Sequence, residues 1–290
     1  MTKTSKASGL SWFFCDLDGT LLRYQNNQHL IEPTTKRAVA QLVESGANFV
    51  VATGRKPSDV RNIYKELGIE QASPYLIANN GAVVWDLKRN SYLNKQTLSL
   101  SDFDLIDHIN QTLNQLNHEY GCILYGLNDQ VYFYHIHAPD SQAFKQYFAF
   151  YEGEFVQNQY LEIDGLKTEY NLVKAIWFFK EVHQQKAVIA QHFTNQERLV
   201  ITSAHSFELV PLNVSKGHAI NLIKQQVKIT DNQIMVLGDS YNDLPMFQHG
   251  VVKVTNHLAP DNLKQLATRV YELPASLFVG QALNDYFKFD

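Results

Sequence analysis

The stretch that decides the fold class of this 290-residue chain is Phe13-Phe14-Cys15-Asp16-Leu17-Asp18-Gly19-Thr20-Leu21-Leu22. Its first residues are apolar and predict a buried strand, and two carboxylates follow directly. Side chains two residues apart in an extended chain point the same way, so Asp16 and Asp18 converge unless the chain turns at once. Two ionised carboxylates held together repel each other, and such a pair shares a proton or sits on a cation. The stretch therefore predicts a strand that ends at a charged site.

A second strand is expected beside the first. Residues 34–46 predict a capped helix, and the apolar run at residues 48–52 stops at Thr53-Gly54-Arg55. Asp16 and Thr53 are 37 positions apart, which is enough for a strand–helix–strand crossover. Such a connection is right-handed and makes the two strands parallel. Asp16 and Thr53 should then face the crevice where open α/β sheets bind ligands.

The strand pattern continues after the crossover. Residues 75–78 predict a third strand, and Asn79-Asn80-Gly81 predicts a hairpin turn into a return strand. Residues 23–33 are polar and predict a connecting loop, because they lack an apolar pattern.

The alternating pattern resumes near Ser215, after a block that mixes helical periodicity with strands of antiparallel character. Lys216 opens a predicted helix that runs to Val227. The strand at residues 233–237 ends at Gly238-Asp239, and residues 242–246 are expected to start the next helix. The intervening block is therefore interpreted as a module inserted into a parallel α/β core.

Composition indicates a soluble, cytoplasmic globular protein. The apolar fraction is 45%, the net charge is −4 and the pI is near 6.3, so no basic face for nucleic acid is expected. The two cysteines have no partner at metal-binding spacing and fit a reducing cytosol. No stretch approaches the roughly 20 consecutive apolar residues of a membrane span, and the first residues do not form a signal peptide.

Residues 16–21 resemble the first motif of the haloacid dehalogenase (HAD) superfamily, most of whose members transfer phosphoryl groups, and this resemblance implies that reaction. Phosphoryl transfer needs a nucleophile, a proton shuttle, a cation and donors to phosphate oxygens, and the residues expected at strand or helix ends are candidates for each part. Asp16 is the predicted nucleophile, forming an aspartyl-phosphate. Asp18 is expected to protonate the leaving group and then to deprotonate the attacking water. Asp239 adds carboxylate oxygen for a cation, and Mg²⁺ suits a site of few carboxylates, waters and phosphate.

The remaining candidates concern the phosphate group. Thr53 offers a hydroxyl and Gly54 a backbone amide, and Lys216 supplies a positive charge beside the clustered aspartates. Arg55 either binds phosphate or anchors its own helix. Each of these residues alone also has an ordinary structural interpretation, as part of a turn, a helix cap or a solvated surface. Their occurrence in order at element ends favours the functional interpretation.

The resemblance to the HAD superfamily extends beyond the first motif at residues 16–21. The resemblance is closer to the Cof-type branch, subfamily IIB. It is carried by four further segments, at residues 52–55, 80–82, 214–220 and 238–246.

This resemblance implies a HAD-like Rossmannoid parallel sheet core, residues 1–86 and 213–290, with an inserted α/β cap at residues 87–212. The 163 positions between Thr53 and Lys216 leave room for such a cap. The resemblance also implies that the backbone carbonyl of Asp18 binds the metal. It implies that Asn242 contacts phosphate or substrate and that Asp243 supports the metal site, directly or through another ligand.

The expected function is a Mg²⁺-dependent phosphatase that acts on a small phosphorylated metabolite, such as a sugar phosphate or a phosphorylated cofactor. Alternatives are a phosphomutase or phosphotransferase of the same fold, and a catalytically silent regulatory protein. A receiver-like signalling protein also uses an acidic pair, Thr and Lys, but it has no reason for an insertion of this size. The sequence indicates neither the oligomeric state nor the physiological substrate.

Overall fold

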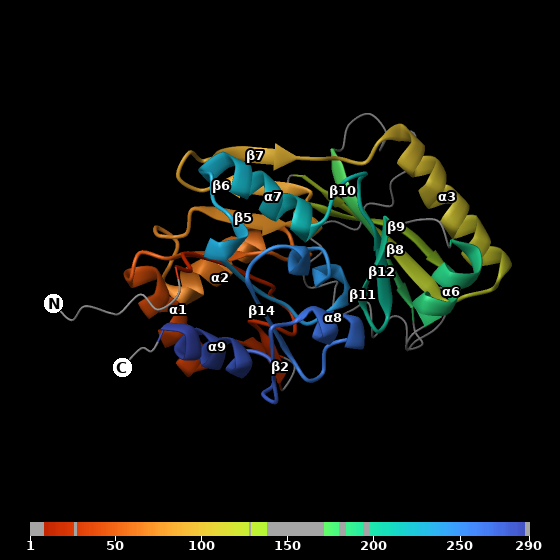
Figure 1. The fold of residues 1–290 in the computed structure, drawn as a ribbon. Helices are drawn as coiled ribbons and strands as arrows, with labels where there is room; N and C mark the ends of the chain where they lie inside the picture. Colours follow the sequence, from red (N-terminus) through yellow and green to blue (C-terminus); the bar gives the residue numbers. More distant parts are fainter. Residues whose placement is uncertain are drawn as a thin grey trace. The chain divides into compact units, whose positions relative to one another are not determined.

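The computed structural model describes residues 9–25, 28–127, 129–137, 171–179, 184–193 and 198–287. The chain forms two compact units (Figure 1). The first contains Met1–Lys95 and Ser215–Asp290, and the second contains Gln96–Val214. The second unit is therefore an insertion between two segments that fold together.

The first unit is built on a five-stranded sheet in which every neighbouring pair of strands is parallel. The order is β15-β14-β13-β1-β4. The strands are β1 (Trp12–Cys15), β4 (Asn48–Val51), β13 (Ile234–Leu237), β14 (Val252–Asn256) and β15 (Arg269–Tyr271). This topology confirms the prediction of a mixed α/β fold with a parallel central sheet.

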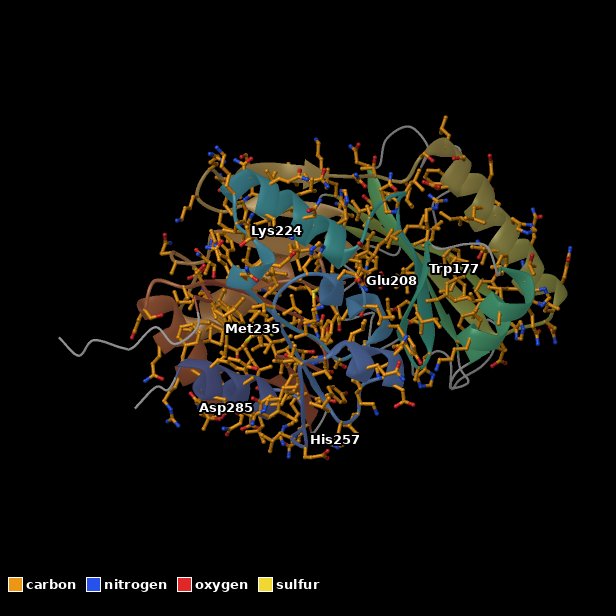
Figure 2. All side chains as sticks on the ribbon, viewed as in Figure 1. Trp177, Glu208, Lys224, Met235, His257 and Asp285 are labelled. Atoms are coloured by element: carbon orange, nitrogen blue, oxygen red, sulfur yellow. The ribbon has the colours of Figure 1, made fainter. Side chains whose placement is uncertain are left out.

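Helices pack against both faces of this sheet. Phe14 lies in one apolar cluster with Ile220 and Ile223 of α7 (Lys216–Val227). Phe13 points to the other face, where its ring centroid lies 5.2 Å from that of Phe287 in α9 (Leu277–Phe287). Strands buried on both faces read as continuous apolar runs, which explains why the strand sequences were recognisable. Met235 marks the centre of this sheet in Figure 2.

The remaining helices of the first unit are α1 (Pro33–Glu44), α2 (Pro57–Leu67) and α8 (Asp261–Leu266). Both α1 and α2 begin with proline, whose missing N–H costs nothing in the first turn. Helix α1 packs against α9, and Figure 1 shows the two helices side by side.

A second, antiparallel sheet consists of β5 (Tyr75–Ala78), β6 (Val83–Asp86) and β7 (Ser91–Lys95). It confirms the predicted return strand. A parallel bridge between Ala52 and Ile77 connects β5 to the end of β4. Strand β7 extends this sheet beyond residue 86, where the sequence interpretation had placed the end of the core segment.

Two local predictions were wrong. The expected loop at residues 23–33 contains the hairpin of β2 (Arg23–Gln25) and β3 (Gln28–Leu30), which the sequence hides because both strands are polar and largely exposed. The helix expected at residues 242–246 is replaced by the short 3₁₀ turns η3 (Tyr241–Asp243) and η4 (Met246–Gln248). Ser240 and Asp243 form a capping box that begins a helical turn, but Pro245 lacks the N–H that would bond to the Tyr241 carbonyl, so the turn does not continue as an α-helix.

The second unit contains a five-stranded antiparallel sheet in the order β11-β12-β10-β8-β9, with helices α3 (Leu100–Gln115) and α6 (Gln184–His192). The strands are β8 (Tyr120–Gly126), β9 (Val131–His137), β10 (Leu172–Phe179), β11 (Leu199–Ser203) and β12 (Ser206–Leu209). Trp177, labelled in Figure 2, is fully buried and its indole N–H donates to Asn110 Oδ1 at 2.8 Å. The sequence also predicts a helix at residues 141–151, and these lie outside the described residues.

Among the described residues, no helix combines the length and the apolar character that crossing a bilayer requires.

Candidate active site

The first two candidate carboxylates are placed by neighbouring parallel strands. Cys15 of β1 pairs with Leu237 of β13, and the Asp16 amide donates to the Leu237 carbonyl at 2.8 Å. Asp16 and Asp239 thus follow adjacent strands at the same edge of the sheet. Parallel strands bring their carboxyl ends together, and this register accounts for the meeting of residues more than two hundred positions apart.

An acidic cluster forms at this edge. Each of Asp16, Asp239 and Asp243 contributes a carboxylate oxygen, and these oxygens lie within 4.8 Å of one another. The Lys216 ammonium, only 1% exposed, donates to Asp16 Oδ1 at 2.5 Å and to Asp243 Oδ1 at 2.7 Å. Three carboxylates against one ammonium leave an excess of negative charge in a buried site.

Burial and the excess negative charge shift the pKa values of the cluster. Burial, followed by repulsion from Asp243, raises the pKa of Asp16 well above its usual range, although Lys216 opposes the rise. Burial and Asp243 likewise raise the pKa of Asp239 to about 7. Burial alone would lower the pKa of Lys216, but the two carboxylates that it binds keep that pKa above its ordinary value. Lys216 is therefore charged, but its single positive charge does not balance the three carboxylates.

Asp243 is engaged through both of its oxygens. Oδ1 binds Lys216, and Oδ2 accepts hydrogen bonds from the amides of Asp239 and Ser240 at 2.9 and 3.0 Å. A Cβ on Gly238 would approach Asp243 Cγ to 2.7 Å, so glycine is needed where the strand meets this carboxylate. Asp243 thus holds the Asp239 turn and Lys216 in place.

The donor set fits a hard cation such as Mg²⁺, which prefers carboxylate oxygen. Asp16 and Asp239 are the side chains available to hold it, since Asp243 is occupied by Lys216 and backbone amides. Thr20 Oγ1 donates to Asp239 Oδ1 at 2.6 Å and orients that carboxylate.

Asp18 lies in a different environment from Asp16. Gly19 has φ of 83°, and the Asp18 side chain is 46% exposed whereas Asp16 is buried. Arg55 donates to both oxygens of Asp18, from Nε at 2.8 Å and from Nη2 at 2.5 Å. His29 of β3 lies 3.1 Å from Arg55 Nη2 through its Nε2 atom. The sequence suggested two roles for Arg55, phosphate binding and anchoring of its own helix. The contact with Asp18 was not predicted.

Thr53 and Asn242 lie on separate loops of the same unit. Thr53 is buried just beyond β4, and its Oγ1 accepts from the Arg55 amide at 3.1 Å. Asn242 Nδ2 donates to Asn80 Oδ1 at 3.1 Å. Residues 80–82 carry part of the family resemblance, but no role was assigned to Asn80 because Asn79-Asn80-Gly81 was interpreted as a hairpin turn.

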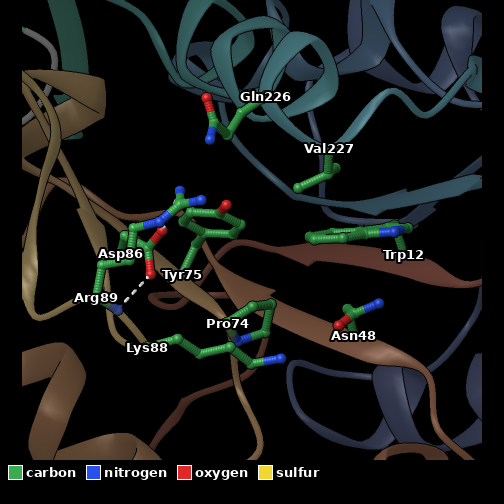
Figure 3. Close-up of a pocket in the computed structure, with 9 residues that line it drawn as sticks. All are labelled: Trp12, Asn48, Pro74, Tyr75, Asp86, Lys88, Arg89, Gln226 and Val227. Atoms are coloured by element: carbon green, nitrogen blue, oxygen red, sulfur yellow. Dashed lines mark hydrogen bonds and ion pairs between the residues drawn. The ribbon is translucent and has the colours of Figure 1, made fainter.

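A separate pocket lies at the opposite ends of the strands (Figure 3). Trp12 and Tyr75, the first residues of β1 and β5, line it together with Asp86 and Arg89, and its volume is about 280 Å³. The Asp86 carboxylate accepts hydrogen bonds from the Arg89 backbone amide at 2.9 Å and from its guanidinium at 3.2 Å. None of the expected catalytic residues lines this pocket, so the acidic cluster is the candidate active site.

Comparisons with known proteins agree with this fold. The phosphatase YwpJ of Bacillus subtilis is 26% identical over 270 residues, covering 88% of this chain and 92% of the relative. The HMP-PP phosphatase of Yersinia enterocolitica is 28% identical, covering 92% and 88%. The solved HAD subclass IIB sugar phosphatase BT4131 superposes with a TM-score of 0.72 at 17% identity, covering 95% of this chain and 98% of that one. Residues 13–276 match the haloacid dehalogenase-like hydrolase family, and the chain belongs to it.

Proposed function

We propose that the protein is a Mg²⁺-dependent phosphatase that hydrolyses small phosphomonoesters through Asp16. The observation that carries this proposal is the buried cluster in which Lys216 binds both Asp16 and Asp243 beside Asp239. Such a cluster costs stability, since like charges repel in a site of low dielectric. An ion pair with Lys216 needs only one carboxylate, whereas two further carboxylates beside it suit a site for a cation.

In the first half of the reaction, a carboxylate oxygen of Asp16 attacks phosphorus. The bond between phosphorus and the ester oxygen breaks as Asp18 gives that oxygen a proton, which leaves an aspartyl-phosphate and a free alcohol. Lys216 and the Thr53 hydroxyl stabilise charge on the phosphoryl oxygens together with the Gly54 amide. A bound Mg²⁺ supplies further positive charge to those oxygens.

The second half of the reaction regenerates the enzyme. Water attacks the phosphorus, Asp18 accepts its proton, and the bond between phosphorus and Asp16 breaks to release inorganic phosphate. The pairing of Arg55 with Asp18 holds the shuttle carboxylate at the exposed side of the site, where water and leaving group are accessible.

Names of relatives support a small phosphorylated metabolite as substrate, since one is an HMP-PP phosphatase and a structural neighbour is a sugar phosphatase. We assign the inserted unit, Gln96–Val214, the role of a cap over the substrate. A cytoplasmic location is consistent with Cys15 and Cys122, which are both buried and free. Neither nucleic acid nor membrane is proposed as a partner.

The test is hydrolysis of a panel of phosphomonoesters with and without Mg²⁺, using wild type and Asp16→Asn. The variant should lose at least about a thousand-fold in kcat, the scale of losing a nucleophile. Asp86→Asn is the matched control, because Asp86 is also buried in the first unit but lies in the separate pocket. This control should retain activity.

Three results would contradict the proposal. One is undiminished hydrolysis by Asp16→Asn, and another is full activity after chelation of divalent cations. The third is transfer of phosphate to an added sugar in place of release, which would indicate a phosphotransferase.

A further inference from the structure

We propose that Asn80 is a positioning residue. Its side-chain amide holds the Asn242 side chain beside the Thr53–Gly54 loop, where the transferred phosphoryl group binds. This inference rests on the proposed function and adds to it a residue outside the expected catalytic set.

Backbone hydrogen bonds join the Asn79–Asn80 turn to the residues on either side of Gly54. The Asn80 amide donates to the Thr53 carbonyl at 2.9 Å, and the Asn79 amide donates to the Arg55 carbonyl at 2.8 Å. The loop after β4 is therefore fixed to the loop after β5. A rigid loop keeps the Thr53 hydroxyl and the Gly54 amide in one arrangement, as preorganised phosphate donors require.

The Asn80 side chain bridges this loop and η3. Its Oδ1 accepts from Asn242 Nδ2 at 3.1 Å, and a Cβ built on Gly54 would lie 3.3 Å from both Oδ1 and Nδ2 of Asn80. The amide thus packs directly on the Gly54 backbone while it binds Asn242. Asn242 immediately precedes Asp243, which binds Lys216, so the bridge places Asn242 next to the cluster.

The conformation of the turn is unfavourable for stability. Asn79 and Asn80 are consecutive left-handed residues, with φ of 49° and 56°, and they are 1% and 2% exposed. Glycine would adopt these angles without strain. Among the described residues, no hydrogen-bond partner is found for either side-chain polar atom of Asn79. Strain and buried polar groups of this kind concentrate at functional sites.

The experiment compares Asn80→Gly, Asn242→Ala and the double variant. Glycine at position 80 keeps the left-handed backbone and its backbone hydrogen bond to Thr53, and removes only the side-chain amide. Asn90→Gly is the matched control, because Asn90 is also left-handed, with φ of 51°, but is exposed in the turn between β6 and β7. Measurements are kcat and KM for a hydrolysed phosphomonoester, the inhibition constant of inorganic phosphate in Mg²⁺, and thermal stability.

Each single variant should lose about ten-fold in kcat/KM and bind inorganic phosphate correspondingly more weakly. The double variant should also lose about ten-fold, since either change alone already removes the hydrogen bond between Asn80 and Asn242. Asn90→Gly should match wild type. A purely structural role of Asn80 would instead lower thermal stability and give losses that multiply to about a hundred-fold.

Unchanged kinetics in Asn80→Gly, or multiplicative losses, would overturn this inference while leaving the phosphatase proposal intact. A wild-type protein that neither hydrolyses phosphomonoesters nor binds inorganic phosphate in Mg²⁺ would overturn both.

Discussion

Lys216 links the stability of the protein to its proposed chemistry. Its ammonium is buried and binds two carboxylates that would otherwise face each other without compensation. Removing one partner of a buried ion pair leaves unpaired charge in a medium that solvates it poorly, which is more costly than losing the pair as a whole. Lys216 therefore should matter for folding even when no substrate is present.

We predict that Lys216→Met lowers the free energy of unfolding by about 3–5 kcal/mol and abolishes hydrolysis. Lys224→Met is the control on the same helix. Lys224 binds Asp231, whose side chain is 49% exposed, and a pair so open to water contributes at most about 1 kcal/mol. Urea unfolding in the presence of a chelator measures both variants without a contribution from bound metal. Equal losses in the two variants would contradict the role of the buried pair.

At the residue scale, the sequence allowed the meeting of Asp16 and Asp239 to be predicted, because both follow strands. Asp16 and Asp239 stand directly after apolar runs, and parallel pairing brings such positions together. The contact of Arg55 with Asp18 was not foreseeable, because it depends on how the chain turns at Gly19. Asn80 was missed because its sequence context is identical for a structural turn and for a positioning role.

The start of α7 depends on close packing against the turn after β5. Ser215 caps this helix, its Oγ accepting from the His218 amide at 3.0 Å. Gly81, with φ of 101°, lies so close that a Cβ would collide with the Ser215 carbonyl and approach the Lys216 amide to 3.3 Å. The position of Lys216 is therefore set by the absence of a side chain on another element.

We predict that Gly81→Ala destabilises the protein more than Gly68→Ala, although both glycines have positive φ. Gly68 ends α2 with φ of 70° and open space around its Cα, so alanine there costs about 1–2 kcal/mol from backbone strain alone. Gly81→Ala should add roughly 1–3 kcal/mol for the collision and lower kcat by displacing Lys216. Thermal unfolding and steady-state kinetics test both effects. Full activity in Gly81→Ala would show that α7 is not held in this way.

At the scale of elements, apolar periodicity identified the parallel strands because they are buried on both faces. It failed for the hairpin of β2 and β3, whose residues are polar on both faces, and for the turn after β13, where Pro245 interrupts a capped helical turn. The turn after β13 contains Asp243 of the acidic cluster.

The two units have separate apolar cores. One cluster contains only residues from Leu98 to Leu209, and another contains residues of the first unit from Trp12 to Leu263. The acidic cluster and its hydrogen-bond partners also belong entirely to the first unit. A domain with its own core can fold alone, so the insertion should be separable.

We therefore predict that residues 96–214 fold in isolation, and that the first unit folds when a short Gly/Ser linker joins Lys95 to Ser215. Lys95 is the last residue of β7 and Ser215 directly precedes α7. These two elements pack against each other, so the residues to be joined lie in neighbouring elements. Trp177 is the single tryptophan of residues 96–214 and is fully buried against Phe207, with ring centroids 5.0 Å apart. Its fluorescence should shift to longer wavelength in one cooperative urea transition.

Trp177→Phe in the isolated fragment is the control that assigns the signal, because it should remove the emission while circular dichroism still reports the same transition. The joined first unit should also unfold cooperatively and should show the Mg²⁺ binding proposed for the full chain, since Asp16, Asp239 and Asp243 are all retained. A fragment whose Trp177 is already solvent-exposed without urea would show that its core forms only with the first unit. In that case the insertion and the first unit would be one cooperative structure, and variants of either should destabilise both.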